Sequence, residues 1–141
     1  MINNNYAVSH TSYQIVDHQK NIIGNRIARN FNHVKDLLKS CDIGTSTVIL
    51  KKNIFTDKIK FPSIKTKEDF VLWLRILKKN TKIYGLNHNL MMWTKSNSSL
   101  SSSTIQKLLD GYRVYNKYMK FNFVKSIYYL ICLSLNFIIK K

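Results

Sequence analysis

The sequence predicts a mixed α/β domain that continues into C-terminal helices. Runs rich in β-branched and aromatic residues, such as 6–16 and 45–51, alternate with stretches of helical periodicity, such as 66–79. At 141 residues the chain is long enough for one domain with a hydrophobic core and too short for two ordinary ones. Its content of 45% hydrophobic residues excludes a largely disordered chain.

The strand candidates begin near the N-terminus. Residues 6–16 and 22–23 flank the polar segment 17–21, so we expect a β-hairpin. Apolar residues at helical spacing predict a short amphipathic helix over 33–41, and the β-branched run 45–51 predicts a buried strand.

The clearest helix is expected over residues 66–79. Thr66 is the predicted N-cap, with Asp69 three residues later as in a variant of the capping box. Acidic residues stand in the first turn and basic residues in the last, as the helix macrodipole favours. The inward stripe is expected to consist of Phe70, Trp73, Leu74 and Leu77.

Shorter elements are predicted after this helix. Two short strands are expected at 82–86 and 90–93, separated by three polar residues. The serine-rich segment 96–103 predicts a surface loop, which leads into a helix from 104 to about 120. We therefore divide the chain into residues 1–103 and the C-terminal helices 104–141.

Residues 123–139 form the last predicted element and are apolar almost all round. A helix that spans a bilayer takes about 20 predominantly apolar residues. This segment is shorter and is interrupted by Lys125 and Asn136, so we do not expect it to span. Two alternatives stay open. We favour a helix lying on an anionic membrane surface through residues 121–141, with its flanking lysines on acidic phospholipid. The other is a terminal helix that docks on the domain through one face.

Positive charge is unusually high and unevenly placed. The formal net charge is +16, and eighteen of the 23 basic residues follow residue 47. Such a protein is attracted to nucleic acid, acidic lipid or phosphorylated substrates. Tyr112, Tyr115 and Tyr118 are interleaved with basic residues, but aromatic residues at helical spacing are more typical of packing. Nucleic-acid binding is therefore the less favoured alternative.

Several kinds of site are excluded by composition. Four glycines and one proline leave no glycine-rich phosphate loop of the Walker or dinucleotide type. Cys41 and Cys132 are too few for a disulfide framework, and we expect ordinary buried thiols in a reducing cytoplasmic compartment. The N-terminal residues are polar, so we expect no secretory signal peptide. The histidines have no metal-ligand spacing, and no metal site is predicted.

Paired carboxylates occur at one place only. Glu68 is the single glutamate of the chain, and it stands beside Asp69 at the start of the predicted helix. A carboxylate held there can accept a proton from an attacking hydroxyl. The alternative is that the two acids merely favour the first helical turn.

Several blocks in a fixed order resemble the acceptor-side half of family 2 glycosyltransferases, in particular the bacterial enzymes of lipopolysaccharide, capsule and teichuronic acid assembly. The blocks are 41–52, 67–74, 83–86 and 98–102, with a weaker one at 5–13. The resemblance implies that residues 1–103 form part of a GT-A (nucleotide-diphospho-sugar transferase) fold lacking the N-terminal nucleotide-binding half.

The resemblance also implies roles for particular residues. Asp69 is the expected general base, with Glu68 as its neighbour, in an inverting transfer from a nucleotide sugar to a hydroxyl of a surface glycan or lipid-linked acceptor. Thr45 and Ser46 are expected on the acceptor side of the cleft. Lys95 stands near the position of a phosphate-binding arginine of the family, as an imperfect substitute because lysine lacks the planar fork of donors.

The N-terminal nucleotide-binding half of the family and its metal-binding motif are both missing from this sequence. The family holds a divalent metal, Mg or Mn, through an Asp-x-Asp motif, but no two aspartates here lie two residues apart. We therefore expect an N-terminally truncated chain that is inactive in isolation or works with a separate N-terminal half, at the inner face of the cytoplasmic membrane. The rival from another class is a non-catalytic basic module that binds membrane surfaces or nucleic acid.

Overall fold

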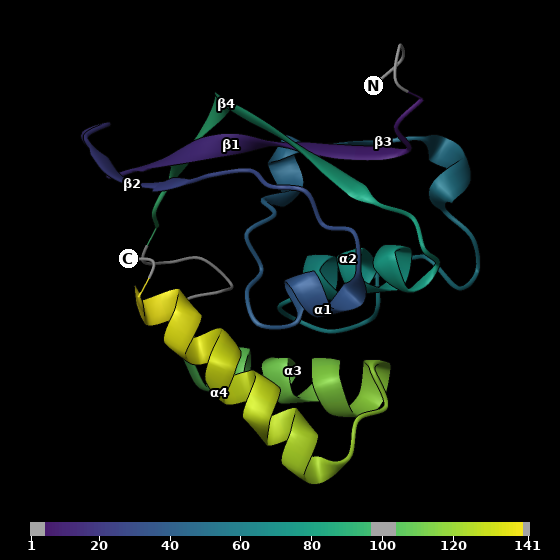
Figure 1. Cartoon of the computed structure of the whole chain (residues 1–141). Coiled ribbons are helices and arrows are strands. Elements are labelled where there is room, and N and C mark those ends of the chain that lie inside the picture. The colour runs from purple at the N-terminus through teal and green to yellow at the C-terminus, as the bar shows by residue number, and fades with distance from the viewer. Residues whose placement is uncertain (1–4, 97–103, 140–141) are drawn as a thin grey trace.

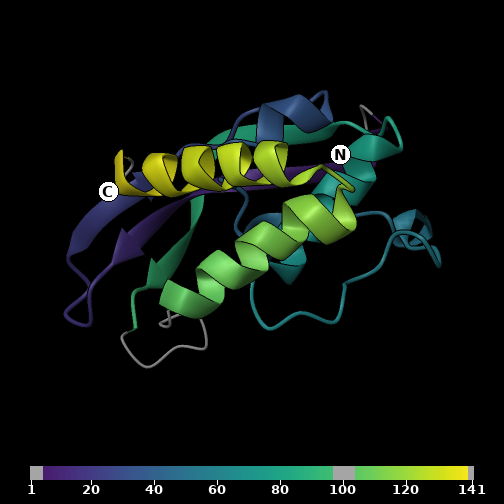
Figure 2. The same cartoon turned by 90° about the horizontal axis from the view of Figure 1, so that it is seen from below.

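The computed structural model describes residues 5–96 and 104–139, and its elements are stacked in three layers (Figure 1). A four-stranded sheet forms one side, α1 and α2 lie beneath it, and α3 and α4 form the opposite side, nearest the viewer in Figure 2. The elements are β1 (Val8–Val16), β2 (Ile22–Arg26), α1 (Val34–Leu37), β3 (Val48–Leu50), α2 (Glu68–Lys78), β4 (Ile83–Thr94), α3 (Thr104–Arg113) and α4 (Phe123–Ile139).

Strand β1 is the centre of the sheet. It pairs antiparallel with β2 near its C-terminal end and with β3 near its N-terminal end, and parallel with β4 along its whole length. The predicted hairpin is confirmed, with Tyr13 opposite Arg26 and Val16 opposite Ile22. The Asp17 carboxylate accepts backbone N–H bonds from Gln19 and Asn21 and so stabilises the turn.

The two short strands predicted at 82–86 and 90–93 are one strand, β4, of twelve residues. The polar residues between them do not break the strand. They lie in its exposed part, and the register of the pairing with β1 shifts there. Asn87 is used instead as a partner: its side-chain oxygen accepts the Ser12 hydroxyl at 2.9 Å. The prediction of a break was therefore wrong.

Two other N-terminal predictions need correction. The helix expected over 33–41 is only the single turn of α1, closed by the Asp36 carboxylate, which accepts the N–H groups of Asn32 and His33. The strand expected over 45–51 starts as a 3₁₀ turn at Thr45–Thr47, because the Thr47 hydroxyl bonds the carbonyl of Gly44. Only β3 remains extended, and it is not buried.

Helix α2 is more deeply enclosed than its sequence pattern predicts. The expected stripe is buried, but so are the residues on its other sides, and all lie in the main hydrophobic cluster: Phe70, Val71, Leu72, Trp73, Leu74, Ile76 and Leu77. The N-cap is Lys67 and not Thr66, which is itself buried. Lys67 has left-handed backbone angles, φ 64° and ψ 21°.

The helix predicted over 104–120 is confirmed, although its last part, Val114–Tyr118, is a π-helix. Tyr115 is buried there, and its hydroxyl donates to the carbonyl of Leu38 at 2.6 Å. This residue therefore packs, as its helical spacing favoured. The serine-rich loop prediction falls on residues 97–103, which lie outside the described residues.

Helix α4 docks on the protein through one face, where Ser126 and Leu133 are buried. The docked alternative is thus observed, yet the opposite face stays exposed and apolar, with Val124 75% and Ile131 53% exposed. Within 5–96 and 104–139, no helix has both the length and the apolar character needed to cross a membrane.

The burial of α2 predicts a matched pair of leucine substitutions. Leu72→Ala should lower the free energy of unfolding by about 2–5 kcal/mol, because Leu72 is fully buried and leaves a cavity. Leu90→Ala, at a side chain that is 69% exposed, should change it by only about 0.5 kcal/mol. Urea denaturation measures both, and equal losses would contradict the central place of α2.

Candidate functional site

A cavity of about 680 Å³ lies between the sheet, the N-terminus of α2 and the C-terminal helices. Its walls differ in character. Polar residues at the start of α2 and in the 3₁₀ turn line one part, and apolar side chains from the sheet and from α4 line another. The polar part includes Thr45, Ser46 and Asp69, and the apolar part includes Ile15, Trp93, Leu130, Leu133 and Phe137. Such a space suits a ligand with polar and apolar portions.

Asp69 is the best-placed carboxylate in this cavity. It is the second residue of α2 and is half-buried. Its Oδ2 accepts the Thr45 hydroxyl at 2.9 Å, and its Oδ1 accepts the backbone N–H of Phe70 at 2.7 Å. The positive end of the helix dipole favours a negative charge at this position. The carboxylate is thus held from two sides and can accept a proton from a ligand hydroxyl in the cavity.

The structure separates the sequence-predicted site residues into two groups. Thr45, Ser46 and Asp69 line the same cavity, although they are far apart in sequence. Glu68 and Lys95 are not among its lining residues. Lys95 lies just after the end of β4, where its backbone N–H donates to the carbonyl of Val16.

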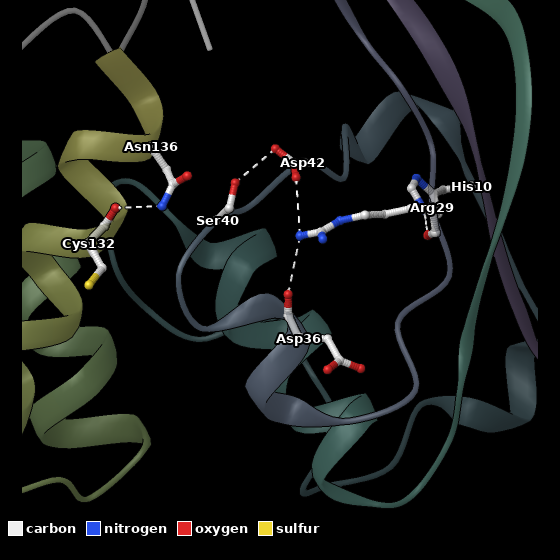
Figure 3. A network of polar contacts seen from close by, with 7 residues as sticks. All are labelled: His10, Arg29, Asp36, Ser40, Asp42, Cys132 and Asn136. Atoms are coloured by element: carbon white, nitrogen blue, oxygen red, sulfur yellow. Dashed lines mark hydrogen bonds and ion pairs between the residues drawn. The ribbon is translucent and has the colours of Figure 1, made fainter. Parts of the chain in front are cut away.

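Sequence reasoning missed a buried polar network at one wall of the cavity (Figure 3). The buried Asp42 accepts the Ser40 hydroxyl at 3.0 Å and forms an ion pair with Arg29 at 3.5 Å. Arg29 also donates to the backbone carbonyl of Asp36, so one guanidinium links two segments. The only signal in the sequence was the polar pair at 40 and 42, at the start of the block 41–52 that carries part of the family resemblance.

His10 is attached to the same network from the sheet. Its Nε2–H donates to the carbonyl of Arg29 at 2.9 Å, while its buried Nδ1 has no hydrogen-bond partner among the described residues. Burial lowers the pKa of His10, and the bond to Arg29 and the charge of Asp42 oppose this only in part. The imidazole is therefore neutral near pH 7.

Cys41 lines the cavity beside Asp42, as a free thiol. Burial, followed by the negative charge of Asp69, raises the pKa of the Cys41 thiol far above its ordinary value. The thiol is thus protonated at physiological pH and is a poor nucleophile.

The described residues do not fit the divalent metal that the family resemblance implies. Across 5–96 and 104–139, no group of three or more His, Cys, Asp or Glu side chains is arranged to hold a metal ion. The two carboxylates of the cavity are also committed, Asp42 to Ser40 and Arg29 and Asp69 to Thr45. The roles assigned to these residues therefore do not involve a metal held by them.

Comparison with known proteins gives two similar enzymes. One is the UDP-Glc:alpha-D-GlcNAc-diphosphoundecaprenol beta-1,3-glucosyltransferase WfgD of Escherichia coli, 33% identical over 133 residues, which are 93% of this chain and 51% of that protein. The other is TuaG of Bacillus subtilis (strain 168), named as a teichuronic acid biosynthesis glycosyltransferase, 30% identical over 106 residues, 75% of this chain and 42% of that protein.

The chain is related to bacterial glycosyltransferases. It spans about half the length of the curated relatives that it matches. No protein-family model matches the chain, and no solved structure gives a significant match.

The neutral, buried His10 predicts a pH dependence of stability. An unfolded histidine has a pKa of about 6.5, and the folded value is lower, so below pH ~6.5 the unfolded chain binds a proton that the folded chain does not. The free energy of unfolding should fall as the pH drops from about 6.5 toward the folded pKa.

The His10→Gln variant should lose less stability than the wild type as the pH falls over this range, because the glutamine amide does not titrate. Urea denaturation at pH 7.5 and 5.5 measures the difference, and the other three histidines act as internal controls since both proteins contain them. An identical loss in the two proteins would contradict the assignment.

Proposed function

We propose that this chain forms the acceptor-binding part of a family 2 glycosyltransferase domain of the GT-A type, in which Asp69 is the general base. The reaction would transfer a sugar from a nucleotide sugar, with inversion, to a hydroxyl of a bacterial surface glycan or lipid-linked acceptor. The observation that supports this most directly is the anchored Asp69 carboxylate at the wall of a cavity with polar and apolar portions. Glycosyltransferase relatives that match most of the chain add support.

In the proposed mechanism, Asp69 takes the proton of the acceptor hydroxyl. The acceptor oxygen forms a bond to the anomeric carbon of the donor sugar while the bond from that carbon to the diphosphate breaks on the opposite face. Because the acceptor oxygen attacks the face opposite to the departing diphosphate, the anomeric centre is inverted. The Thr45 hydroxyl keeps the Asp69 carboxylate turned toward the cavity, and Ser46 beside it is the second polar group for an acceptor sugar.

The outer parts of the cavity fit an amphipathic acceptor. Leu130, Leu133 and Phe137 supply an apolar wall, and Lys67 and Lys107 bring positive charge to the lining. WfgD is named for an alpha-D-GlcNAc-diphosphoundecaprenol acceptor. A similar acceptor for this chain would place its sugar at Asp69 and its lipid along α4. Lys95 would contact a phosphate only if the ligand extends beyond the cavity.

The donor side is proposed to lie elsewhere. The nucleotide sugar and a divalent metal, Mg or Mn, would be held by the part of the relatives' length that this chain does not match. A separate N-terminal half would then be the partner, and the chain alone would transfer no sugar.

Binding measurements test whether this chain binds the acceptor and not the donor. A GlcNAc diphospholipid with a short isoprenoid chain should bind the protein and shift the backbone amide signals of Ser46 and Phe70 in NMR spectra. Asp69→Asn should retain this binding, because only the proton acceptor is lost. UDP-glucose with Mg²⁺ should not bind.

Two phenylalanines of α4 provide a matched control. Phe137→Ser should weaken acceptor binding about tenfold, because Phe137 lines the cavity. Phe123→Ser, at a residue outside the lining, should leave the affinity within about twofold. Failure of the acceptor to bind would refute the acceptor site, and micromolar, metal-dependent binding of UDP-glucose would refute the assignment of the donor site elsewhere.

A second role is favoured by the outer face of α4. Its exposed apolar side chains outside the cavity lining recur at helical spacing and form one stripe: Val124, Tyr128, Ile131 and Leu135. We propose that this stripe lies on the inner face of the cytoplasmic membrane, with nearby lysines attracted to acidic phospholipid. That position would bring the cavity close to lipid-linked acceptors.

Vesicle flotation tests the membrane contact without removing α4, whose inner face packs on the protein. The triple variant Val124→Ser, Ile131→Ser, Leu135→Ser, at residues outside the cavity lining, should lose binding to vesicles of phosphatidylglycerol and phosphatidylethanolamine. The control Ile22→Ser, Ile27→Ser, Ile49→Ser removes equally exposed side chains elsewhere and should float like the wild type. Equal flotation of the two variants would rule out the stripe, and DNA binding with a steep salt dependence would favour the nucleic-acid alternative.

A further inference from the structure

Asp110 of α3 is a completely buried carboxylate outside the cavity lining. It receives four hydrogen bonds. Its Oδ2 accepts the backbone N–H and the hydroxyl of Thr66, both at 3.0 Å, and the side-chain amide of Gln106 at 2.9 Å. Its Oδ1 accepts Arg113 at 2.9 Å, which is also an ion pair. A buried charge is tolerated only where its oxygens are satisfied in this way.

The balance of these contacts favours the charged form of Asp110. Burial acts to raise its pKa, but the hydrogen bonds from Gln106, Thr66 and Arg113 outweigh this effect and hold the pKa below the ordinary value. Two of the donors, Gln106 and Arg113, belong to the same helix. The bonds to Thr66 are different, because they join α3 to a segment 44 residues earlier in the chain.

Thr66 directly precedes the unusual start of α2. The next residue, Lys67, has left-handed backbone angles although it is not glycine, a conformation that persists only where the surrounding structure holds it. The carbonyl of Lys67 accepts the first helical bond, from the N–H of Val71 at 3.2 Å. Holding Thr66 therefore holds the residue from which α2 begins.

A second contact reinforces the same connection. The side-chain stem of Lys67 passes beside Gly111, the neighbour of Asp110. A β-carbon on Gly111 would lie 3.6 Å from Cε of Lys67 and only 2.8 Å from Leu130 of α4. Two successive residues of α3 thus lie beside two successive residues before α2, and the glycine leaves room for the close approach of Leu130.

We propose that Asp110 is a positioning residue for Asp69: through Thr66 it fixes the N-terminus of α2, and thereby the direction of the Asp69 carboxylate into the cavity. Asp69 lies two residues after Lys67, and its Oδ1 bonds the Phe70 N–H in the same first turn. The importance of this positioning for sugar transfer rests on the proposed function, but the clamp itself does not.

Hydrogen exchange distinguishes a local clamp from a general contribution to stability. Loss of general stability raises exchange of the slowest core amides together, whereas loss of the clamp opens the first turn of α2 selectively. Asp110→Asn and Thr66→Val should raise exchange of the Phe70 and Val71 amides about tenfold more than that of the Leu77 amide. Thr66→Ser keeps the hydroxyl and should restore slow exchange.

Ser12→Ala is the matched control. It removes two hydrogen bonds at a buried serine far from α2, one donated to Asn87 and one accepted from the Ala28 N–H. It should lower global stability without a selective effect on Phe70 and Val71. If Asp110→Asn does not fold, Thr66→Val still decides the question, because it deletes a single hydroxyl.

The outcomes separate this proposal from the proposed function. Exchange at Phe70 and Val71 that rises no more than at Leu77, or rises equally in Ser12→Ala, would overturn the clamp. If the clamp variants open the first turn, and if Asp110→Asn, at a residue outside the cavity lining to which Thr66 belongs, also weakens binding of the GlcNAc diphospholipid at least about threefold, the positioning role in ligand recognition is supported. Selective opening with unchanged acceptor affinity would overturn that role and leave the acceptor site intact, while no acceptor binding even in the wild type would refute the proposed function alone.

Discussion

Helix α2 must be kept from water on almost every side, and this requirement determines where the other elements lie. Seven of its residues are buried, from Phe70 to Leu77 with the exception of Arg75. Burying a side chain of this size contributes about 1.5–3 kcal/mol, so the helix needs cover from two directions. The sheet lies above it, and the π-helix with its buried Val114 and Tyr115 lies below, followed by α4 (Figure 1).

The same enclosure concentrates polar chemistry at one end of α2. A helix N-terminus presents backbone N–H groups that lack helical partners, and such groups attract carboxylates. Asp69 stands at this end. Asp110 accepts a hydrogen bond from Thr66, the residue before the N-cap Lys67. The buried polar residues Thr66 and Asp110 therefore lie at the start of an apolar helix, next to a cavity that the apolar side chains of α4 help to line.

Local patterns in the sequence predicted those elements whose stability is mostly local. The hairpin follows from a polar turn between two β-branched runs, α2 from helical periodicity and α4 from a long apolar run. Polar residues at 87–89 led to the wrong expectation of a break between two strands, since nothing local indicates that β1 lies alongside to keep the chain extended. Likewise Thr66 has the side chain of an N-cap, but it bonds Asp110 instead, and that partner is set by packing in three dimensions.

The residues of the candidate site also include some that local sequence patterns indicate and some that they do not. Asp69 could be predicted because the helix that carries it is recognisable and because its block resembles a known family. Its contact with Thr45 across 24 residues agrees with the block order but is not visible in any periodicity. The Arg29–Asp42 pair and Asp110 could not be predicted, because a single charged residue in a helix or loop is usually a solvated one.

The parallel pairing of β1 with β4 has a further consequence, for the time course of folding during synthesis. Val8 pairs with Ile83, so these partners are separated by 75 residues. A ribosome adding about 5–20 residues per second takes about 4–15 s to make that stretch. Strand β2 can pair with β1 early in this interval, but one whole edge of β1 waits until β4 has emerged. A nascent chain thus spends seconds with its central strand half-paired, a period in which a chaperone or a neighbouring nascent chain competes with β4 for that edge.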